Sequence, residues 1–386
     1  MDFELPGEDD PRRTEVKAWL AANPKPTGME LAKGGYVVPH WPAPWGKDAD
    51  PVHQLIIDEE LRKAGVSRPG NTIGIGWAGP TIVHAGTQEQ KDRYLWPLLA
   101  GEEIWCQLFS EPGAGSDLAN LGTRAVRDGD EYVVNGSKIW TSLAHHSKFG
   151  ILIARTNPDA PKHKGVSYFI CPMDLPGIEV RPIIEMTGSH TFNEVFFDEV
   201  RIPAANLVGN EHEGWGLAKV TLGNERVSLS GEGALWGRGP TAGDLIDAVK
   251  KGTFGDAADP LARQALAKLH TEAEVLRLIR LRTVSAAIKG KPPGPEASVR
   301  KALADEHGQH IMGLAKDLAG ADGMLDRPAG MWHYGFLFAP ALTVGGGTSE
   351  VQRNIVGERV LGLPHDIDVE AGQTWSEARA KAGKAS

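Results

Sequence analysis

Cysteine is scarce in this sequence: only Cys106 and Cys171 occur among its 386 residues. Two cysteines provide neither a disulfide framework nor the ligand spacing of a metal site. No apolar run approaches the roughly 18 residues that a membrane-spanning helix needs. The acidic stretch at residues 1–13 also lacks the apolar core of a secretory signal. We therefore expect a cytoplasmic protein with no metal ion and no membrane association.

Positive charge is also in short supply. The chain has 41 Lys and Arg against 50 Asp and Glu, which gives a net charge of −9. This balance argues against nucleic acid as a main partner, although local charges can still hold an anionic ligand. The length allows two or three domains around substantial cores. Hydrophobic residues make up 41% of the chain and charged residues 24%, as in ordinary globular proteins.

Hydrophobic spacing changes twice along the chain. Short β-type runs bounded by turns fill residues 104–208, whereas helical spacing precedes them and returns from 215 to 361. The basic loop at 161–164 is expected to be solvated. The predicted N-terminal helices cover residues 11–22, 51–65, 74–85 and 89–99. The predicted domains are 1–103 (α-helical), 104–209 (β) and 210–364 (helical), with a polar, mobile tail at 365–386.

The stretch from Gln107 to Ser142 carries the densest chemistry. Its turn at 110–117 is rich in glycine, which lets a backbone approach a ligand closely, and successive amides there can bind an anion. An ordinary surface turn explains the same residues equally well. Two short strands follow around a hairpin, then a second turn at Asn135–Gly136 and a strand that begins at Ile139. Trp140 beside hydroxyl groups could offer a flat heterocycle a wall and a hydrogen bond.

Several ordered motifs resemble the acyl-CoA dehydrogenase family. They are Ser110–Asp117 (SEPGAGSD), Asp128–Ser142 (DGDEYVVNGSKIWTS), Phe192–Asp198 (FNEVFFD) and Gly345–Arg353 (GGGTSEVQR). The resemblance covers about residues 10 to 363 and is far more specific than a single glycine motif. It implies an α+β fold: an N-terminal α-helical domain, a central β-barrel-like domain and a C-terminal four-helix bundle. Family members hold FAD between the β domain and the bundle, and a neighbouring subunit completes the site.

The resemblance also indicates where a catalytic base could lie. The common position in the family corresponds to Gly346, which cannot accept a proton. The second position, immediately before an Arg on the first helix of the bundle, corresponds to Glu225, followed by Arg226. A Glu-Arg pair by itself is usually a solvated helix face. The missing carboxylate at Gly346 favours Glu225 as the base.

Cofactor and substrate residues follow from the same motifs, one position at a time. Trp140 matches the residue that packs on the flavin ring, and Ser142 matches the hydroxyl that meets its N5 atom. Thr348 matches a residue near the phosphate-ribose arm, and Glu350 is either near the cofactor or solvated. The residues matched to the flavin turn are Phe109, Ser110, Gly115 and Ser116. Those matched to the acyl-CoA site are Ser116, Arg226 and Gly346.

Two departures from the family pattern concern the half of a flavin site that each chain lends to its neighbour. Lys251 stands where many members carry an Arg, and Lys lacks the bidentate geometry of Arg. Asp317 stands before the turn at Gly320 where a Gln is usual, and a carboxylate would repel a pyrophosphate. The lent half-site is therefore expected to be weak, which leaves a homo-oligomer and a hetero-oligomer with a related subunit both open.

The predicted function is FAD-dependent oxidation of an acyl-CoA to the trans-2-enoyl-CoA, in fatty-acid or steroid-side-chain β-oxidation. An electron-transferring flavoprotein is the expected acceptor. Two alternatives remain: a flavin oxidase or monooxygenase on the same fold, and a non-catalytic partner subunit of a hetero-oligomeric acyl-CoA dehydrogenase. The run Gly345–Gly347 removes side-chain volume beside the expected reacting carbons, which would admit a branched or ring-containing acyl group. A tight turn explains these glycines equally well.

Overall fold

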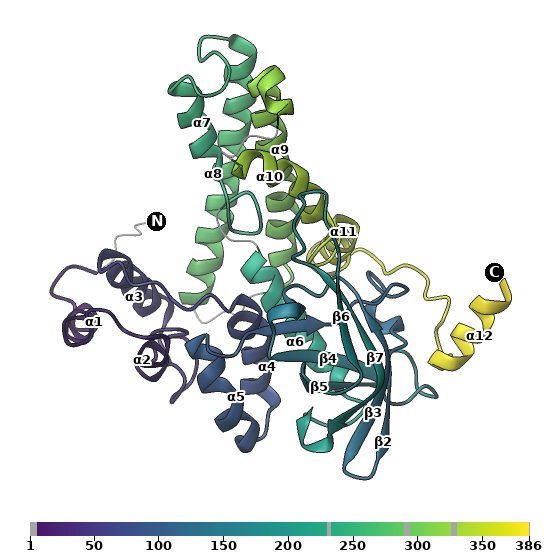
Figure 1. Cartoon of the computed structure of the whole chain (residues 1–386). Helices are drawn as coiled ribbons and strands as arrows, with labels where there is room; N and C mark the ends of the chain where they lie inside the picture. Colours follow the sequence, from purple (N-terminus) through teal and green to yellow (C-terminus); the bar gives the residue numbers. More distant parts are fainter. Residues whose placement is uncertain (1–5, 230–232, 289–293, 326–329, 386) are drawn as a thin grey trace. The chain divides into compact units, whose positions relative to one another are not determined.

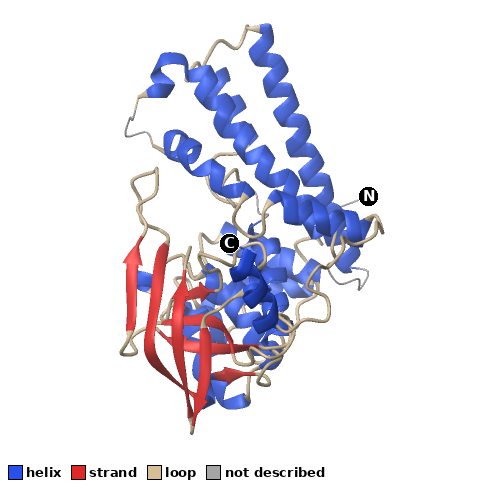
Figure 2. Ribbon diagram, turned by 90° about the vertical axis from the view of Figure 1, so that its right-hand side faces the viewer, coloured by secondary structure: helices blue, strands red, loops and turns tan. Residues whose placement is uncertain are grey.

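The computed structural model describes residues 6–229, 233–288, 294–325 and 330–385. Two compact units emerge from the contacts within it. The first, here called the sheet unit, comprises Met1–Ile183, His190–Thr221 and Val369–Ser386. The second, the helical unit, comprises Ile184–Ser189 and Leu222–Asp368. Figure 1 labels the elements of both units, and Figure 2 distinguishes helices from strands.

The N-terminal part of the sheet unit is helical, as predicted. Local capping explains several boundaries: the Asp10 side chain accepts a hydrogen bond from the backbone of α1, and Thr27 and Thr87 form capping boxes at α2 and α5. A short helix, α2, was not predicted. The elements are α1 (Pro11–Ala22), α2 (Gly28–Lys33), α3 (Pro51–Lys63), a π-helical turn (Gly74–Ala78), α4 (Gly79–Ala85) and α5 (Gln88–Ala100).

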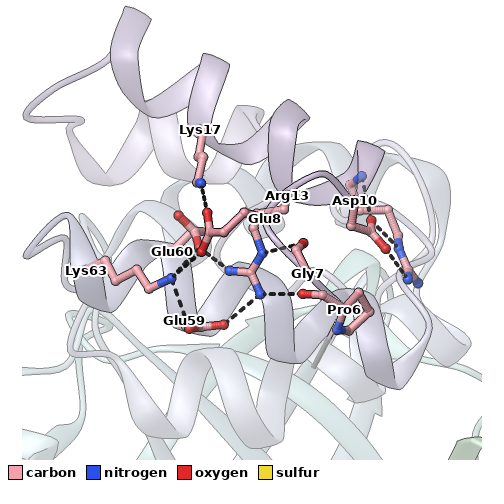
Figure 3. Close-up of polar contacts among 10 residues, drawn as sticks. Pro6, Gly7, Glu8, Asp10, Arg13, Lys17, Glu59, Glu60 and Lys63 are labelled. Atoms are coloured by element: carbon pink, nitrogen blue, oxygen red, sulfur yellow. Dashed lines mark hydrogen bonds and ion pairs between the residues drawn. The ribbon is translucent and has the colours of Figure 1, made fainter. Parts of the chain in front are cut away.

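A buried guanidinium joins α1 to α3 (Figure 3). Arg13 is 3% exposed and forms ion pairs with Glu59, at 2.9 Å, and with Glu60. It also donates to backbone carbonyls of the preceding loop. Hydrogen bonds from Lys63 and Arg13 lower the pKa of Glu59. Because a buried charge is tolerated only when it is paired, this network fixes how the two helices pack.

The β part forms one eight-stranded sheet in the order β6-β7-β3-β2-β4-β5-β8, with β1 parallel to β4. β4 is buried along its whole length and carries the centre of the core. The apolar side chains of this core include Leu108, Tyr132, Leu152, Phe169 and Val195. The strands are β1 (Trp105–Leu108), β2 (Arg124–Asp128), β3 (Glu131–Lys138), β4 (Phe149–Arg155), β5 (Val166–Pro172), β6 (Ile178–Pro182), β7 (Asn193–Pro203) and β8 (Leu207–Val208).

Two sequence-based predictions within the sheet are wrong. The pair Asn135–Gly136 is not a turn, because β3 continues through it with a shift of register against β7. Gly136 adopts φ 146°, and a Cβ there would lie 2.6 Å from the Thr123 hydroxyl, so the bulge requires glycine. No strand begins at Ile139 either: β3 ends at Lys138, and Trp140 has a φ of 60°.

The helical unit contains the long helices α8 and α9, which pack on each other and on shorter helices. Its buried apolar residues include Leu245, Leu269, Ile311, Met312 and Leu342. α7 and α10 lie within residues 215–361, the stretch for which helical spacing is predicted. The helices that belong wholly or partly to this unit are α6 (Gly214–Leu229), α7 (Ala242–Lys250), α8 (Pro260–Ile288), α9 (Ala297–Ala319), α10 (Met331–Phe338) and α11 (Ser349–Ile355).

The segment that we predict to be a mobile tail contains a further helix, α12 (Trp375–Ala385), which belongs to the sheet unit. The boundaries near residues 104 and 209 stay predictions. None of the helices in the described part of the chain is long and apolar enough to cross a bilayer.

Candidate functional site

The glycine-rich turn leaves β1 and is open on its outer side. Neither Gly113 nor Gly115 has a positive φ, and a Cβ added at either would meet no protein atom within 4 Å. Ser116 beside them is exposed. The chain's own packing therefore does not require glycine at these two positions. Their lack of side chains leaves room beside the backbone, as a ligand that approaches it closely would need.

The turn is tied directly to the Trp140 segment, so the structure brings the two parts of the predicted flavin seat together. The amide of Ile139 donates to the carbonyl of Ser110 at 2.8 Å. The ammonium of Lys138 donates to the carbonyl of Phe109 at 2.9 Å. Residues almost 30 positions apart in sequence are thereby held in one place.

The side chain of Trp140 lies at the surface rather than in the core. Trp140 is 57% exposed. Its backbone is left-handed, which is a costly conformation for a bulky residue. Thr141 keeps the segment in place by exchanging backbone hydrogen bonds with Asn193, at 2.9 and 3.1 Å. One edge of the indole meets Phe192, with ring centroids 6.1 Å apart. Ser142, half-buried, follows two positions later. An exposed ring on a strained and well-fixed backbone suits the stacking of a flat heterocycle.

A buried ion pair that no sequence motif predicted stiffens this part of the chain. Lys138 is fully buried and contacts Glu111 at 2.8 Å. Glu111 also accepts hydrogen bonds from the amides of Gly122 and Thr123. Burial opposes its charge, but Lys138 and the two amides outweigh burial and lower the pKa of Glu111. The two ends of the loop 110–123 are thus held by one carboxylate.

The helix that carries Glu225, α6, begins against side chains that also contact Phe109 at the start of the flavin turn. Thr221 of α6 makes buried hydroxyl contacts with Thr81, at 2.8 Å, and with Tyr168 of β5, at 3.0 Å. Tyr168 in turn packs edge-on against Phe109, with ring centroids 6.1 Å apart. A Cβ on Gly214 would lie 2.5 Å from the backbone of β5, so glycine lets α6 begin directly on the sheet. Tyr168 therefore contacts both the start of the flavin turn and the first half of α6, and we call this contact the anchor of α6. No sequence motif predicted it.

Glu225 lies four residues beyond Thr221, which places both on one side of α6. Glu225 is only 6% exposed. The alternative interpretation of the Glu-Arg pair as a solvated helix face is therefore wrong for Glu225. A buried carboxylate in a helix is uncommon and is a candidate for a functional group. The predicted role of Arg226 stays a prediction, because the structure describes its backbone in α6 but not its side chain.

The glycine run near the C-terminus forms a tight turn. Gly346 and Gly347 have φ values of 66° and 88°, and the buried Gln352 amide donates to both of their carbonyls, at 3.1 and 3.2 Å. Thr348 caps α11 by accepting from the amide of Val351. Glu350 is exposed in the first turn of α11. The left-handed backbone supports the turn explanation for two of the three glycines and leaves their effect on substrate shape untested.

The predicted half-site residues of the helical unit, Lys251, Asp317 and Gly320, lie near the ends of α7 and α9. A Cβ on Gly255 would lie 3.2 Å from the Leu318 side chain, so the segment after Lys251 runs beside the end of α9. Lys251, Asp317 and Gly320 are all exposed. Gly320 is left-handed at φ 56° and ends α9. Lys251 and Asp317 therefore present their charges to solvent.

Comparison with known proteins assigns the family. Models of the N-terminal, middle and C-terminal acyl-CoA dehydrogenase domains match residues 9–102, 106–200 and 212–361. Acyl-CoA dehydrogenase IpdE1 of Mycobacterium tuberculosis is 37% identical over 365 residues, covering 94% of this chain and 91% of the relative. The chain belongs to the acyl-CoA dehydrogenase family, whose members are flavoprotein oxidoreductases.

Three further proteins, one curated relative and two solved structures, are similar to this chain. Acyl-CoA dehydrogenase FadE34 of Mycobacterium tuberculosis is 43% identical over 337 residues, which are 87% of this chain but 46% of the relative; the chain thus spans about half of that protein. The crystal structure of the ChsE4–ChsE5 complex from Mycobacterium tuberculosis is 32% identical with a TM-score of 0.76, covering 95% of this chain and 100% of that one. A structure described as the Tcur3481–Tcur3483 steroid ACAD is 30% identical with the same TM-score, and the coverage is again 95% and 100%.

Proposed function

We propose that this protein uses FAD to dehydrogenate an acyl-CoA thioester to the trans-2-enoyl-CoA, with Glu225 as the catalytic base. The observation that carries the proposal is the burial of Glu225 on α6, the helix whose anchor joins it to the start of the flavin turn. The open glycine turn and the presented Trp140 fit the flavin. When bound, FAD supplies the acceptor for the hydride that leaves the β carbon.

The chain's own residues would divide the remaining work. Trp140 would pack on the flavin ring, Ser142 would donate to its edge, and the amides of the turn from Ser110 to Ser116 would line its polar side. Thr348 would lie near the phosphate-ribose arm. Trp140 is exposed, and Ser142 and Thr348 are half-buried, so these three side chains are accessible for such contacts.

Proton abstraction is the step that needs a buried carboxylate. The α proton of a thioester is weakly acidic, so the base must be positioned accurately and kept away from water. Glu225 is buried, whereas Gly346 has no acidic group and Glu350 is exposed. Removing the proton leaves an enolate-like charge at the thioester oxygen, which hydrogen-bond donors must stabilise as it forms.

The substrate class follows from the relatives by analogy. One structural neighbour is described as a steroid ACAD. We propose a branched or steroid-side-chain acyl-CoA as the substrate and an electron-transferring flavoprotein as the acceptor. For assembly, we propose a hetero-oligomer with a related subunit, because Lys251 and Asp317 are exposed and poorly suited to a pyrophosphate.

The test is anaerobic reduction of the flavin by a panel of straight, branched and steroid-side-chain acyl-CoA thioesters. The proposal expects the oxidised flavin absorbance to bleach on mixing with at least one thioester. A flavin oxidase would instead hold reduced flavin only until oxygen is admitted and would release peroxide. A protein that binds flavin but is bleached by no acyl-CoA would contradict the proposed function.

A further inference from the structure

The C-terminal segment Val369–Ala385, here called the strap, is folded onto the sheet unit. The amides of Trp375 and Ser376 donate to the carbonyls of Ala160 and Pro158, at 2.9 and 3.0 Å. The Ser376 hydroxyl donates to the same Pro158 carbonyl at 2.9 Å. These contacts set the start of α12, labelled in Figure 1, against the loop that joins β4 to β5. The strap is therefore a docked element with a defined register.

The indole of Trp375 reaches the C-terminal end of the loop 110–123, here called the flavin loop. Its ring nitrogen donates to the carbonyl of Asn120 at 3.3 Å. A Cβ on Gly122 would lie 3.7 Å from the Trp375 ring and 3.7 Å from Glu111, the carboxylate that binds the buried Lys138. The strap and the ion pair of the flavin seat thus meet at a single residue.

A buried arginine joins the strap to the loop more firmly. Arg155 is 1% exposed and donates to the carbonyls of Ala119, at 2.6 Å, and Leu121, at 3.3 Å. The Trp375 ring covers its guanidinium, 5.0 Å from the ring centroid. Burial lowers the pKa of Arg155 to about 10. A desolvated guanidinium needs both its carbonyl acceptors and an aromatic face, so removing the ring would expose the group to water.

Lys162 adds a second connection. It bridges Asp117, next to Ser116, and Glu370 of the strap, at 3.0 and 2.8 Å. Only 22% of its side chain is exposed, so the solvated loop that we predict at 161–164 is wrong for this residue. The two connections hold residues 117 and 119–122, which flank the open glycine turn on its C-terminal side.

We propose that the strap positions the flavin loop, with Trp375 and Lys162 as positioning residues that act through Arg155 and Asp117. The inference rests on the proposed function, since the loop matters only if it receives the cofactor. Neither residue touches the reacting atoms. Their effect is expected on the order of the loop and on the affinity for FAD and acyl-CoA, whereas turnover of the flavin-saturated enzyme should be unchanged.

The test is hydrogen exchange of the full-length chain in its purified assembly, which reports local opening without any substrate. Trp375→Ala should speed exchange of peptides covering residues 116–123 by at least about tenfold, the ratio expected when a desolvated cation–π contact is lost. Peptides of β5, residues 166–172, should exchange at the wild-type rate. Lys381→Ala, on an exposed position of the same helix, is the matched control and should change neither.

Two further variants keep the outcome decisive. Trp375→Phe keeps an aromatic face for Arg155 but has no ring nitrogen to donate to Asn120. It should restore most of the protection, because the inference assigns the main effect to the aromatic face over Arg155. If Trp375→Ala also speeds exchange in β5, Lys162→Met decides, because it removes the bridge while the indole stays. Unchanged exchange at 116–123 in both Trp375→Ala and Lys162→Met would overturn the inference.

A flavin titration separates this inference from the proposed function. In Trp375→Ala the Kd for FAD and the KM for acyl-CoA should rise by about tenfold at unchanged kcat in saturating FAD, equivalent to the loss of one desolvated contact. If the wild-type assembly binds no flavin, the proposed function fails while the exchange result still decides whether the strap orders the loop. Equal Kd values in Trp375→Ala and Lys381→Ala would contradict the positioning role.

Discussion

The two regions that carry the predicted flavin residues are built in different ways. In the sheet unit, Ser110 and Ile139 share a backbone hydrogen bond, and the fully buried Lys138 holds Glu111 and the Phe109 carbonyl. In the helical unit, Lys251 and Asp317 are exposed. The flavin residues of the sheet unit are held by contacts within that unit, whereas Lys251 and Asp317 of the helical unit present their charges to solvent. This difference supports the proposal that the chain keeps a preorganised flavin site and lends a weak half-site to its neighbour.

The largest effect is expected from removing the base. Glu225→Gln is nearly isosteric but cannot accept the α proton, so FAD should remain bound while flavin reduction slows by at least about 10²–10⁴-fold. Single-turnover anaerobic mixing measures this rate. Glu102→Gln, on an exposed glutamate to which no role is assigned, is the control and should reduce at the wild-type rate. Near-normal turnover in Glu225→Gln would remove this residue from the mechanism.

The next effect concerns the stability of the preorganised region. Lys138→Met leaves the Glu111 carboxylate without its buried partner, and breaking a buried pair in this way costs about 3–5 kcal/mol. Denaturant unfolding measures the change. Lys148→Met breaks an exposed pair with Asp174 and should cost about 1 kcal/mol or less. Equal losses in the two variants would mean that Lys138 does not stiffen the seat.

These predictions separate what a sequence can indicate from what it cannot. The order of the motifs indicated the family, the location of the flavin turn and the helix of Glu225, because each motif is local. The Lys138–Glu111 pair was missed because its members lie 27 residues apart and a lysine in a strand is ordinarily exposed. The bulge at Gly136 was mistaken for a turn because Asn-Gly is the strongest short hairpin signal.

The strap was missed for a related reason. Its composition is polar, and its hydrogen bonds, from Trp375 to Asn120 and from Ser376 to Pro158, join residues more than 200 positions apart. Similarly, the anchor of α6 depends on the hydroxyl groups of Thr81, Tyr168 and Thr221, which meet only in the folded chain. Long-range polar contacts between ordinary residues leave no periodic signal in a sequence.

A smaller effect is expected at the flavin ring. Trp140→Ala removes a large exposed apolar surface and should weaken FAD binding by at least about tenfold, because the loss of buried area adds to an aromatic contribution of about 0.5–1.5 kcal/mol. Flavin fluorescence during titration measures the affinity. Trp236→Ala in the helical unit would be a poor control because its ring is packed, so Phe336→Ala, at a 42% exposed position, is preferable. Full occupancy and unchanged fluorescence in Trp140→Ala would place the flavin ring elsewhere.

The last prediction concerns substrate shape. If the glycine turn admits bulky acyl groups, kcat/KM should favour a steroid-side-chain or α-branched thioester over a short straight one, and Gly346→Ala should reduce that preference. A single methylene is worth only about 1–3 kcal/mol. The φ of 66° at Gly346 adds strain to any substitution, so the ratio between substrates, rather than either rate alone, is the quantity to compare. A wild-type preference for straight chains with an unchanged ratio in the variant would leave the glycines with a turn role only.

The contrast between the two regions is tested most directly by counting FAD per chain. Expressed alone, the chain should hold substoichiometric FAD that dissociates on dilution, and co-expression with a related subunit carrying Arg and Gln at the positions of Lys251 and Asp317 should raise it to one per chain. The double variant Lys251→Arg, Asp317→Gln should move the lone chain in the same direction. One tightly bound FAD per chain in a homo-oligomer of the wild-type chain, retained at every dilution, would contradict the account.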